Sequence, residues 1–170
     1  ITCRDWSSDV CSSDLIVRVW VDANRPVVWV EAESGIPLQF RVKYETWRTE
    51  RRKMEGSELF AAYGVTGSPD PVYAEADSIL WPVKGRIAWY HRNSYSCYTA
   101  NLSLQGLGGL VGKFPDPLAG RTFGGCVGGP GLKVQDSATL VSERPSTRHH
   151  AAITLLTTEK IGRASCRERV

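Results

Sequence analysis

The sharpest polar cluster in the sequence is Tyr90-His91-Arg92-Asn93, which stands at the end of an apolar segment. A histidine in such a place could donate or accept a proton near neutral pH. The neighbouring sequence fixes no carboxylate or nucleophile beside His91, so a catalytic role has no support. The alternative is a hydrogen-bonded network at the end of a strand, which would hold the following turn. We predict that these four residues line a cleft or a domain interface, and we assign none of them to catalysis.

The second cluster consists of Glu45, Trp47 and Arg48, within the segment Tyr-Glu-Thr-Trp-Arg at 44–48. A tryptophan can stack on the C–H face of a sugar, and glutamate and arginine can bond its hydroxyls, so the combination suits a cleft lined for carbohydrate. The alternative is a strand whose Trp47 packs in the core and whose Glu45 pairs with Arg48. We add these three residues to the predicted lining of the cleft or interface.

Three other patterns give no cofactor or metal site. The glycine-rich run at 124–131 lacks the Gly-Lys-Ser/Thr ending and the following helix of a phosphate loop, and favours a turn or a bulge. His149 and His150 are adjacent, and adjacent residues of a strand point to opposite faces. Cys97 and Cys126 have no Cys-x-x-Cys spacing. We therefore expect no cofactor and no bound metal.

Strands are the elements that must position these residues. At 38–47, apolar and polar residues alternate, so that Leu38, Phe40, Val42 and Tyr44 share one face. The dipeptide Lys-Gly at 84–85 indicates a hairpin turn between two apolar segments, and a second hairpin is indicated across the turn at 23–26. The predicted strands are 16–22, 27–32, 38–47, 78–83, 86–91, 95–104, 121–127, 132–135, 139–142 and 151–157.

The order of these elements favours an all-β protein, an antiparallel β-sandwich with less than about a fifth of its residues in helices. A hydrophobic content of 42% with 23% charged residues is typical of a globular domain. A net charge of +3 is too small to indicate a nucleic-acid partner. No apolar run reaches the length of a membrane-spanning helix, so no membrane partner is expected.

The two ends of the chain resemble translated sequencing adapters, at 5–15 and 161–170. We therefore predict adapter-derived tails at 1–15 and 160–170, which make few buried contacts, around a partial β-sandwich domain at 16–159. The alternative is a natural polar tail followed at the other end by a basic one. Because the segment at 16–22 begins as a strand with no turn before it, the sandwich is expected to be a fragment, incomplete at both ends. Cys3, Cys11 and Cys166 lie in these tails.

A series of short motifs between the tails resembles an uncharacterised N-terminal domain of large bacterial glycoside-hydrolase-like proteins. Those proteins are similar to the α-L-fucosidase group, whose catalytic domain is an (α/α)6 helical toroid. The resemblance covers most of 16–159, skips the variable segment near 55–77, and rests on the order of the motifs. They are Asp-Ala-Asn-Arg-Pro-Val-Val at 22–28, Tyr-Glu-Thr-Trp-Arg at 44–48, Tyr-His-Arg-Asn at 90–93, Gln-Gly-Leu at 105–107, Asp-Pro-Leu at 116–118 and Arg-Thr-Phe-Gly at 121–124.

The resemblance implies a non-catalytic N-terminal sandwich in a secreted parent protein, extracellular or periplasmic, that hydrolyses glycans. The acid and base would then lie in the rest of the parent chain, in an (α/α)6 domain that would be the partner of this sandwich. Carbohydrate is the other expected partner. On this hypothesis the chain alone hydrolyses nothing. The alternative is a carbohydrate-binding or structural β-sandwich module with no enzymatic context.

Overall fold

The structure is a computed structural model that describes residues 15–63, 67, 71–81, 83–94 and 96–158. The predicted tails fall almost wholly outside these residues, so the expectation for them remains a prediction. In the part of the chain that is described, no helix is long and apolar enough to cross a membrane.

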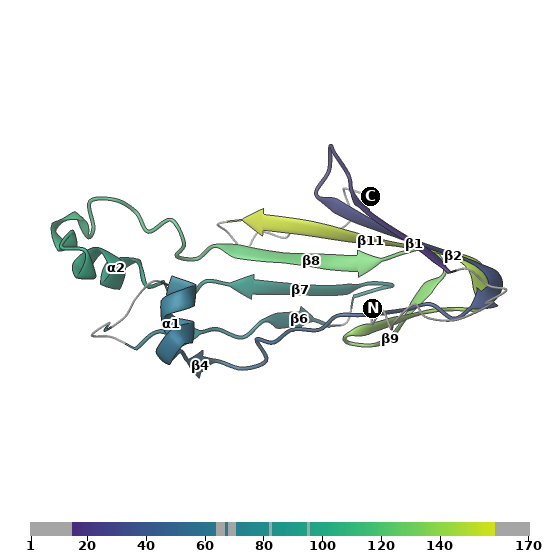
Figure 1. Cartoon of the computed structure of the whole chain (residues 1–170), viewed down its shortest axis with the longest axis horizontal. Helices are drawn as coiled ribbons and strands as arrows, with labels where there is room; N and C mark the ends of the chain where they lie inside the picture. The colour runs from purple at the N-terminus through teal and green to yellow at the C-terminus, as the bar shows by residue number, and fades with distance from the viewer. Residues whose placement is uncertain (1–14, 64–66, 68–70, 82, 95, 159–170) are drawn as a thin grey trace, which may run out of the picture.

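The larger sheet is antiparallel throughout, and its strands follow the order β1-β2-β11-β8-β7-β6 (Figure 1). Its central strands β11 and β8 run side by side along the length of the molecule. The strands of this sheet are β1 (Ile16–Val21), β2 (Val27–Leu38), β6 (Ser78–Leu80), β7 (Ile87–Arg92), β8 (Thr122–Gly128) and β11 (Ser146–Thr158).

A smaller sheet with the order β3-β10-β9 packs on one face of the larger one. The helices lie beyond the C-terminal end of β7 and the N-terminal end of β8 (Figure 1). Its strands are β3 (Arg41–Lys43), β9 (Leu132–Asp136) and β10 (Thr139–Ser142). The remaining elements are β4 (Arg52–Lys53), α1 (Gly56–Tyr63), β5 (Tyr73–Ala74), α2 (Tyr98–Leu104) and the short 3-10 helix η1 (Gly108–Leu110). With 48% strand and 11% helix, the predicted all-β, sandwich-like class is confirmed.

The main core lies between the two sheets. Leu140 of β10 and Ile87 of β7 are 0% and 1% exposed, and Phe40, Val42 and Tyr44 pack against them from the predicted apolar face. This confirms the predicted alternation at 40–44, whereas Leu38 lies at the end of β2. Removing such large side chains from water supplies most of the free energy that holds the two sheets together.

Gly125 shows why part of the glycine-rich run lies in a strand. A Cβ atom at this position would stand 3.0 Å from Cζ2 of Trp89 and 3.1 Å from Cδ2 of Leu155. The absent side chain lets Trp89 lie across β8, and the Tyr44 ring stacks on Trp89 with 4.4 Å between ring centroids. The strand predicted at 121–127 is confirmed as β8, which contains the first half of the glycine-rich run, and the turn predicted within 124–131 lies at the end of that run.

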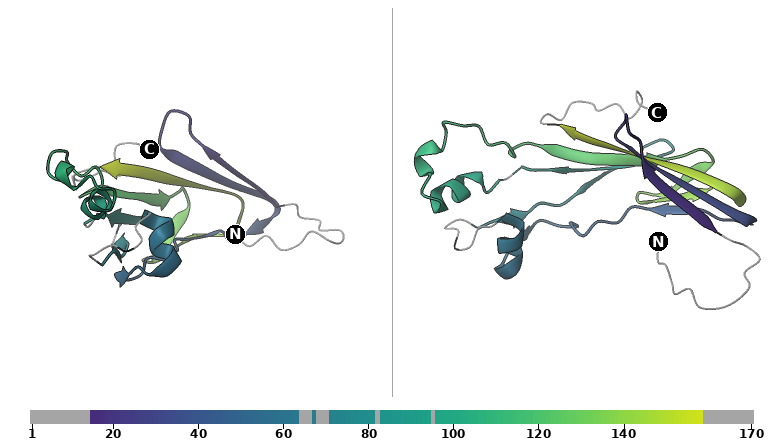
Figure 2. Two further views of the ribbon diagram at one scale, coloured as in Figure 1. Left: turned by 60° about the vertical axis from the view of Figure 1, so that its left-hand side comes forward. Right: turned by 45° about the horizontal axis from the view of Figure 1, so that its top comes forward.

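The β1 end of the larger sheet extends past the smaller sheet (Figure 2). All six residues of β1 are exposed, including Val19 at 59% and Val21 at 70%. β1 is an edge strand of the described sheet, so one row of its backbone N–H and C=O groups is not paired within that sheet. The predicted hairpin with β2 is confirmed, with Trp20 opposite Trp29.

Several predicted elements differ from the structure. The strand predicted at 38–47 is found only as β3, and the strand predicted at 78–83 only as β6. Residues 98–104 form helix α2 instead of a strand, because apolar residues at alternate positions, such as Tyr98 and Leu102, also lie four residues apart on one side of a helix. Gly106, with φ of +73°, follows this helix. β2 extends beyond the predicted strand at 27–32 to Leu38, and its pairing with β11 is irregular between Glu33 and Leu38.

Candidate functional site

A buried carboxylate, Asp77, is the centre of the polar cluster that the fold assembles. Its side chain is 4% exposed and accepts hydrogen bonds from four side chains. Oδ1 lies 2.6 Å from Nε of Arg48 and 2.9 Å from Nδ1 of His91. Oδ2 lies 3.2 Å from the hydroxyl of Tyr44 and also accepts from the hydroxyl of Thr46. We call these five residues the Asp77 network.

Three separate segments bring the Asp77 network together. Tyr44 follows β3, and its N–H donates to the carbonyl of Ala138 at 2.8 Å, which fixes the segment beside the smaller sheet. The Arg48 N–H donates to Oγ1 of Thr46 at 3.1 Å, and the Arg48 carbonyl accepts from the Asp77 N–H at 2.9 Å. Backbone and side-chain bonds thus hold the segment 44–48 to the residue that precedes β6.

His91 reaches the network from β7. Ser78 of β6 lies opposite Tyr90 in the antiparallel ladder, so the preceding residue, Asp77, stands beside His91. The imidazole ring also lies 5.0 Å from the ring of Phe123, its partner on β8. The Phe123 ring therefore covers one side of the His91 imidazole.

The network holds its carboxylate in the charged form. Burial raises the pKa of Asp77, but hydrogen bonds from Arg48, Thr46 and His91 outweigh that effect, and the pKa lies below its ordinary value. Burial, followed by the negative charge of Asp77, raises the pKa of Tyr44, so its hydroxyl keeps the proton that it donates. Because a charged carboxylate only accepts, Nδ1 of His91 carries the hydrogen of their bond.

Arg48 connects this buried network to an exposed aromatic surface. Its guanidinium carbon lies 5.0 Å from the ring centroid of Trp47 and 5.6 Å from that of Phe123. Trp47 is 65% exposed and Phe123 is 39% exposed. We call Trp47, Arg48 and Phe123 the Trp47 surface. The alternative that Trp47 packs in the core is therefore wrong.

The other predicted residue of the 44–48 segment stays apart from the network. Glu45 pairs with Lys43, whose Nζ lies 2.7 Å from Oε1, and both side chains are exposed. The predicted alternative of a pair between Glu45 and Arg48 is wrong, because Arg48 is held by Asp77.

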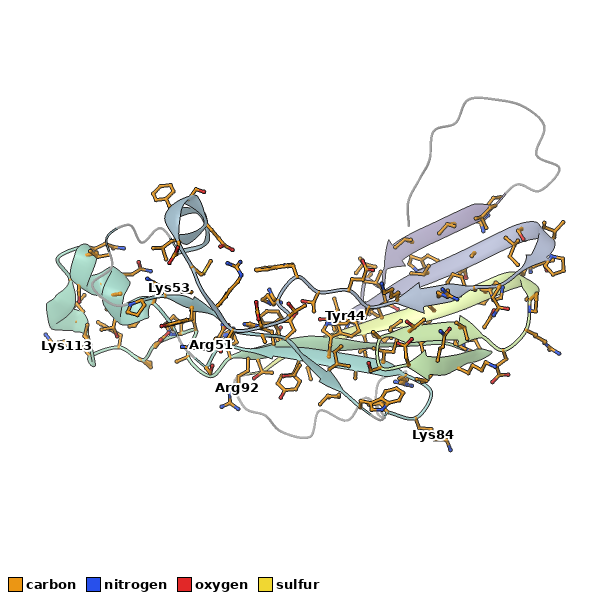
Figure 3. All side chains as sticks on the ribbon, turned by 90° about the horizontal axis from the view of Figure 1, so that it is seen from below. Tyr44, Arg51, Lys53, Lys84, Arg92 and Lys113 are labelled. Atoms are coloured by element: carbon orange, nitrogen blue, oxygen red, sulfur yellow. The ribbon has the colours of Figure 1, made fainter. Side chains whose placement is uncertain are left out.

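The predicted cluster at 90–93 divides between the two faces of β7. His91 faces inward, whereas Arg92 points away from the ribbon on the side opposite Tyr44, as both labels show in Figure 3. Tyr90 alternates with His91 and is half-buried on the other face. Asn93 acts through its backbone, donating to the carbonyl of Arg121 at 2.9 Å and accepting from the N–H of Gly120 at 2.7 Å. Asn93 thus matches the strand-end network that we weighed as the alternative.

Tyr44, Thr46, Asp77 and Phe123 belong to the site but are absent from the predicted lining. Asp77 directly precedes the predicted strand at 78–83, and no local pattern marks it as part of a site. A signal was present in the predicted hairpin around Lys84 and Gly85, because extending its ladder by one pair places residue 77 near His91. Asp77 is therefore 14 residues away from His91 in the sequence but adjacent to it across the hairpin.

A second cluster of charges lies on the exposed outer face of β1, β2 and β11. Glu33 pairs with Arg18 at 3.3 Å and with Arg148 at 2.8 Å, and its side chain is 37% exposed. In the next row, His150 lies 3.3 Å from Glu31. We call these five residues the Glu33 ladder. A shallow groove follows the ladder, lined by Arg18, Glu31, Ala32, Glu33, Arg148 and His150.

Neither cluster has the composition of a metal centre. Within the described ranges, no group of three or more histidine, cysteine or acidic side chains could hold a metal ion. Cys97 and Cys126 are both buried with free thiols, and His149 bonds the carbonyl of Leu38 while His150 faces Glu31, on opposite faces as predicted.

Comparison with known proteins gives a family match. The model of a family described as "Domain of unknown function (DUF5703)", in its N-terminal form DUF5703_N, matches residues 7–166, which include every described residue. No curated protein and no solved structure matches the chain.

Proposed function

The chain belongs to the DUF5703_N family, a family of unknown function, and we propose that it is a non-catalytic β-sandwich domain of a larger, secreted protein that hydrolyses glycans. The observation that carries the non-catalytic part is the state of Asp77. The four hydrogen bonds to this buried carboxylate engage both of its oxygens in holding three segments together.

Glycoside hydrolysis commonly needs two carboxyl groups across one bond, about 5 to 9.5 Å apart. One of them acts as an acid and has a raised pKa. The Asp77 network contains a single carboxylate, and its pKa is lowered. Glu45, the other acidic residue of the predicted lining, is exposed and paired with Lys43. This arrangement suits a structural role.

Two features support a place in a glycan-active protein. The first is the ordered series of motifs that resembles the N-terminal domain of bacterial glycoside-hydrolase-like proteins. The second is Trp47, a large aromatic side chain that is held at the surface beside a fixed arginine. An (α/α)6 domain elsewhere in the parent would supply the acid and the base.

The test compares the parent protein, this chain and a His91→Ala variant of the parent on a panel of plant and host glycans. We expect the parent to release reducing sugar and this chain to release none above a heat-treated sample. A Glu33→Gln parent is the matched control, because Glu33 lies on the opposite face of the sheet. Turnover by this chain alone would refute the non-catalytic assignment. Unchanged activity and stability in His91→Ala would remove the 90–93 cluster from any role at the cleft or interface.

The second candidate is a carbohydrate-binding module with no enzymatic context, which the exposure of Trp47 favours. A parent that binds glycans but cleaves none of them would select this function over the first.

A further inference from the structure

We infer that the Trp47 surface binds one pyranose unit of a neutral glycan. The inference rests on the proposed function for the class of ligand, and adds the site, the charge of the sugar and the groups that would recognise it. Its support is independent of any catalytic role.

The first support is the aromatic area at this surface. Trp47 is 65% exposed and Phe123 is 39% exposed. Removing an aromatic ring from water on ligand binding is favourable, and the C–H face of a pyranose can stack on such a ring. Arg48 lies within 6 Å of both ring centroids, so the two rings belong to one surface.

The second support is the fixed position of Arg48. Its Nε donates to Asp77 at 2.6 Å, and its backbone is bonded to Thr46 and to Asp77. The terminal Nη atoms have no hydrogen-bond partner among the residues that the structure describes, and the side chain is 24% exposed. A planar donor group that is already held in place loses little conformational entropy when it bonds a ligand.

The third support concerns charge. Asp77 is ionised and touches Arg48, so the pair is close to neutral and offers little attraction to an anion. The next basic residues are neutralised as well, since Arg51 pairs with Glu75 and Arg52 pairs with Glu58. Because the positive charges here are neutralised, the hydrogen-bond donors of this surface suit the hydroxyls of a neutral sugar better than they suit the carboxylate of a uronic acid.

The experiment titrates this chain with neutral oligosaccharides of glucose, xylose, mannose and galactose, and with an oligogalacturonate as the acidic arm, followed by isothermal titration calorimetry. We expect saturable binding to at least one neutral member. Trp47→Ala should weaken that binding at least about tenfold, a change of about 1.4 kcal/mol. Arg48→Lys should weaken it as well, because lysine keeps the charge but loses the planar fork.

Trp81→Ala is the matched control, since Trp81 is also more than half exposed but belongs to no part of the Trp47 surface. It should bind like the wild type, and denaturant curves of all variants should report whether the fold is kept. Equal affinity in Trp47→Ala, tighter binding of the oligogalacturonate, or no binding across the neutral panel would each refute the inference. Binding by this chain but not by the parent would also refute the inference, because a neighbouring domain would then cover the surface. Hydrolysis by the parent without binding by this chain would refute this inference and leave the proposed function standing.

Discussion

The Asp77 network and the Glu33 ladder have similar chemistry in different surroundings. In each cluster a central carboxylate, Asp77 or Glu33, lies between cationic or hydrogen-bonding side chains from segments far apart in the sequence. The side chain of Asp77 is 4% exposed, whereas that of Glu33 is 37% exposed. An exposed pair exchanges contacts with water at little cost, while a buried charge depends on its partners. Exposure therefore decides which of two similar ion pairs the fold requires.

The pKa values alone would not separate the two clusters. Hydrogen bonds from Arg148 and Arg18 lower the pKa of Glu33, in the same direction as the pKa of Asp77. Burial raises the pKa of both groups, but it is the largest single effect at Asp77, whereas at Glu33 it is smaller than the effect of either arginine's hydrogen bond. A lowered pKa therefore indicates strong stabilising contacts at the buried Asp77, but only ordinary surface pairing at the exposed Glu33.

The largest predicted effect is that of Asp77→Ala. Removing the carboxylate leaves Arg48 partly buried without its charged partner, so we expect a loss of about 3 to 5 kcal/mol in the free energy of unfolding. Urea denaturation of the purified chain measures it. A loss below about 1 kcal/mol would show that the network is as weakly coupled to folding as a surface pair.

The next effect is that of Tyr44→Phe. The change removes the hydroxyl that bonds Asp77 and keeps the ring that stacks on Trp89. We expect a loss of about 1.5 to 3 kcal/mol, which is typical of a hydrogen bond to a charged group. A denaturant midpoint equal to that of the wild type would show that this hydrogen bond does not contribute to the free energy of unfolding.

A smaller effect is expected from acid, because protonation leaves the carboxyl group of Asp77 in place. Its folded pKa is below the unfolded value, so its stabilisation is full above the unfolded pKa of about 3.9 and is lost as pH falls through the folded pKa. The difference in unfolding free energy between the wild type and Asp77→Asn should therefore narrow between about pH 5 and pH 2. A difference that stays constant over this range would contradict the assigned pKa direction.

The smallest effect is that of Glu33→Ala, where we expect a loss of less than about 1 kcal/mol. Adding 1 M NaCl should reduce even this difference, because salt screens exposed charges. Paired denaturation curves at low and high salt measure both quantities. A loss comparable to that of Asp77→Ala would remove the distinction between the two clusters.

Local pattern was sufficient for much of the fold. The strand predicted at 139–142 has the bounds of β10, and the hairpins formed by β1 and β2 and by β6 and β7 were both predicted. The strand predicted at 95–104 is wrong, because its apolar spacing also fits one side of a helix. In these segments the information needed lies within a few residues along the chain.

The site was harder to predict because it depends on contacts between distant segments. Arg48 and His91 were both chosen as candidates, yet nothing in the sequence near either residue names Asp77 as their common partner. Arg48 lies 29 residues before Asp77, and His91 lies 14 residues after it. Register, which only tertiary packing fixes in full, brings the three side chains together.

The place of β11 in the larger sheet has a consequence for the time course of folding. β11 is the last of the described strands in sequence, yet it lies between β2 and β8, and Arg148 meets a partner 115 residues earlier. Until β11 is available, the hairpin of β1 and β2 has no connection to β8 within the sheet. In a topology of such high contact order, the entropy cost of closing a long loop comes before the favourable contacts of strand pairing. Folding is therefore slow. During synthesis, β1 and β2 therefore cannot be connected to β8, β7 and β6 within the sheet until β11 has been made.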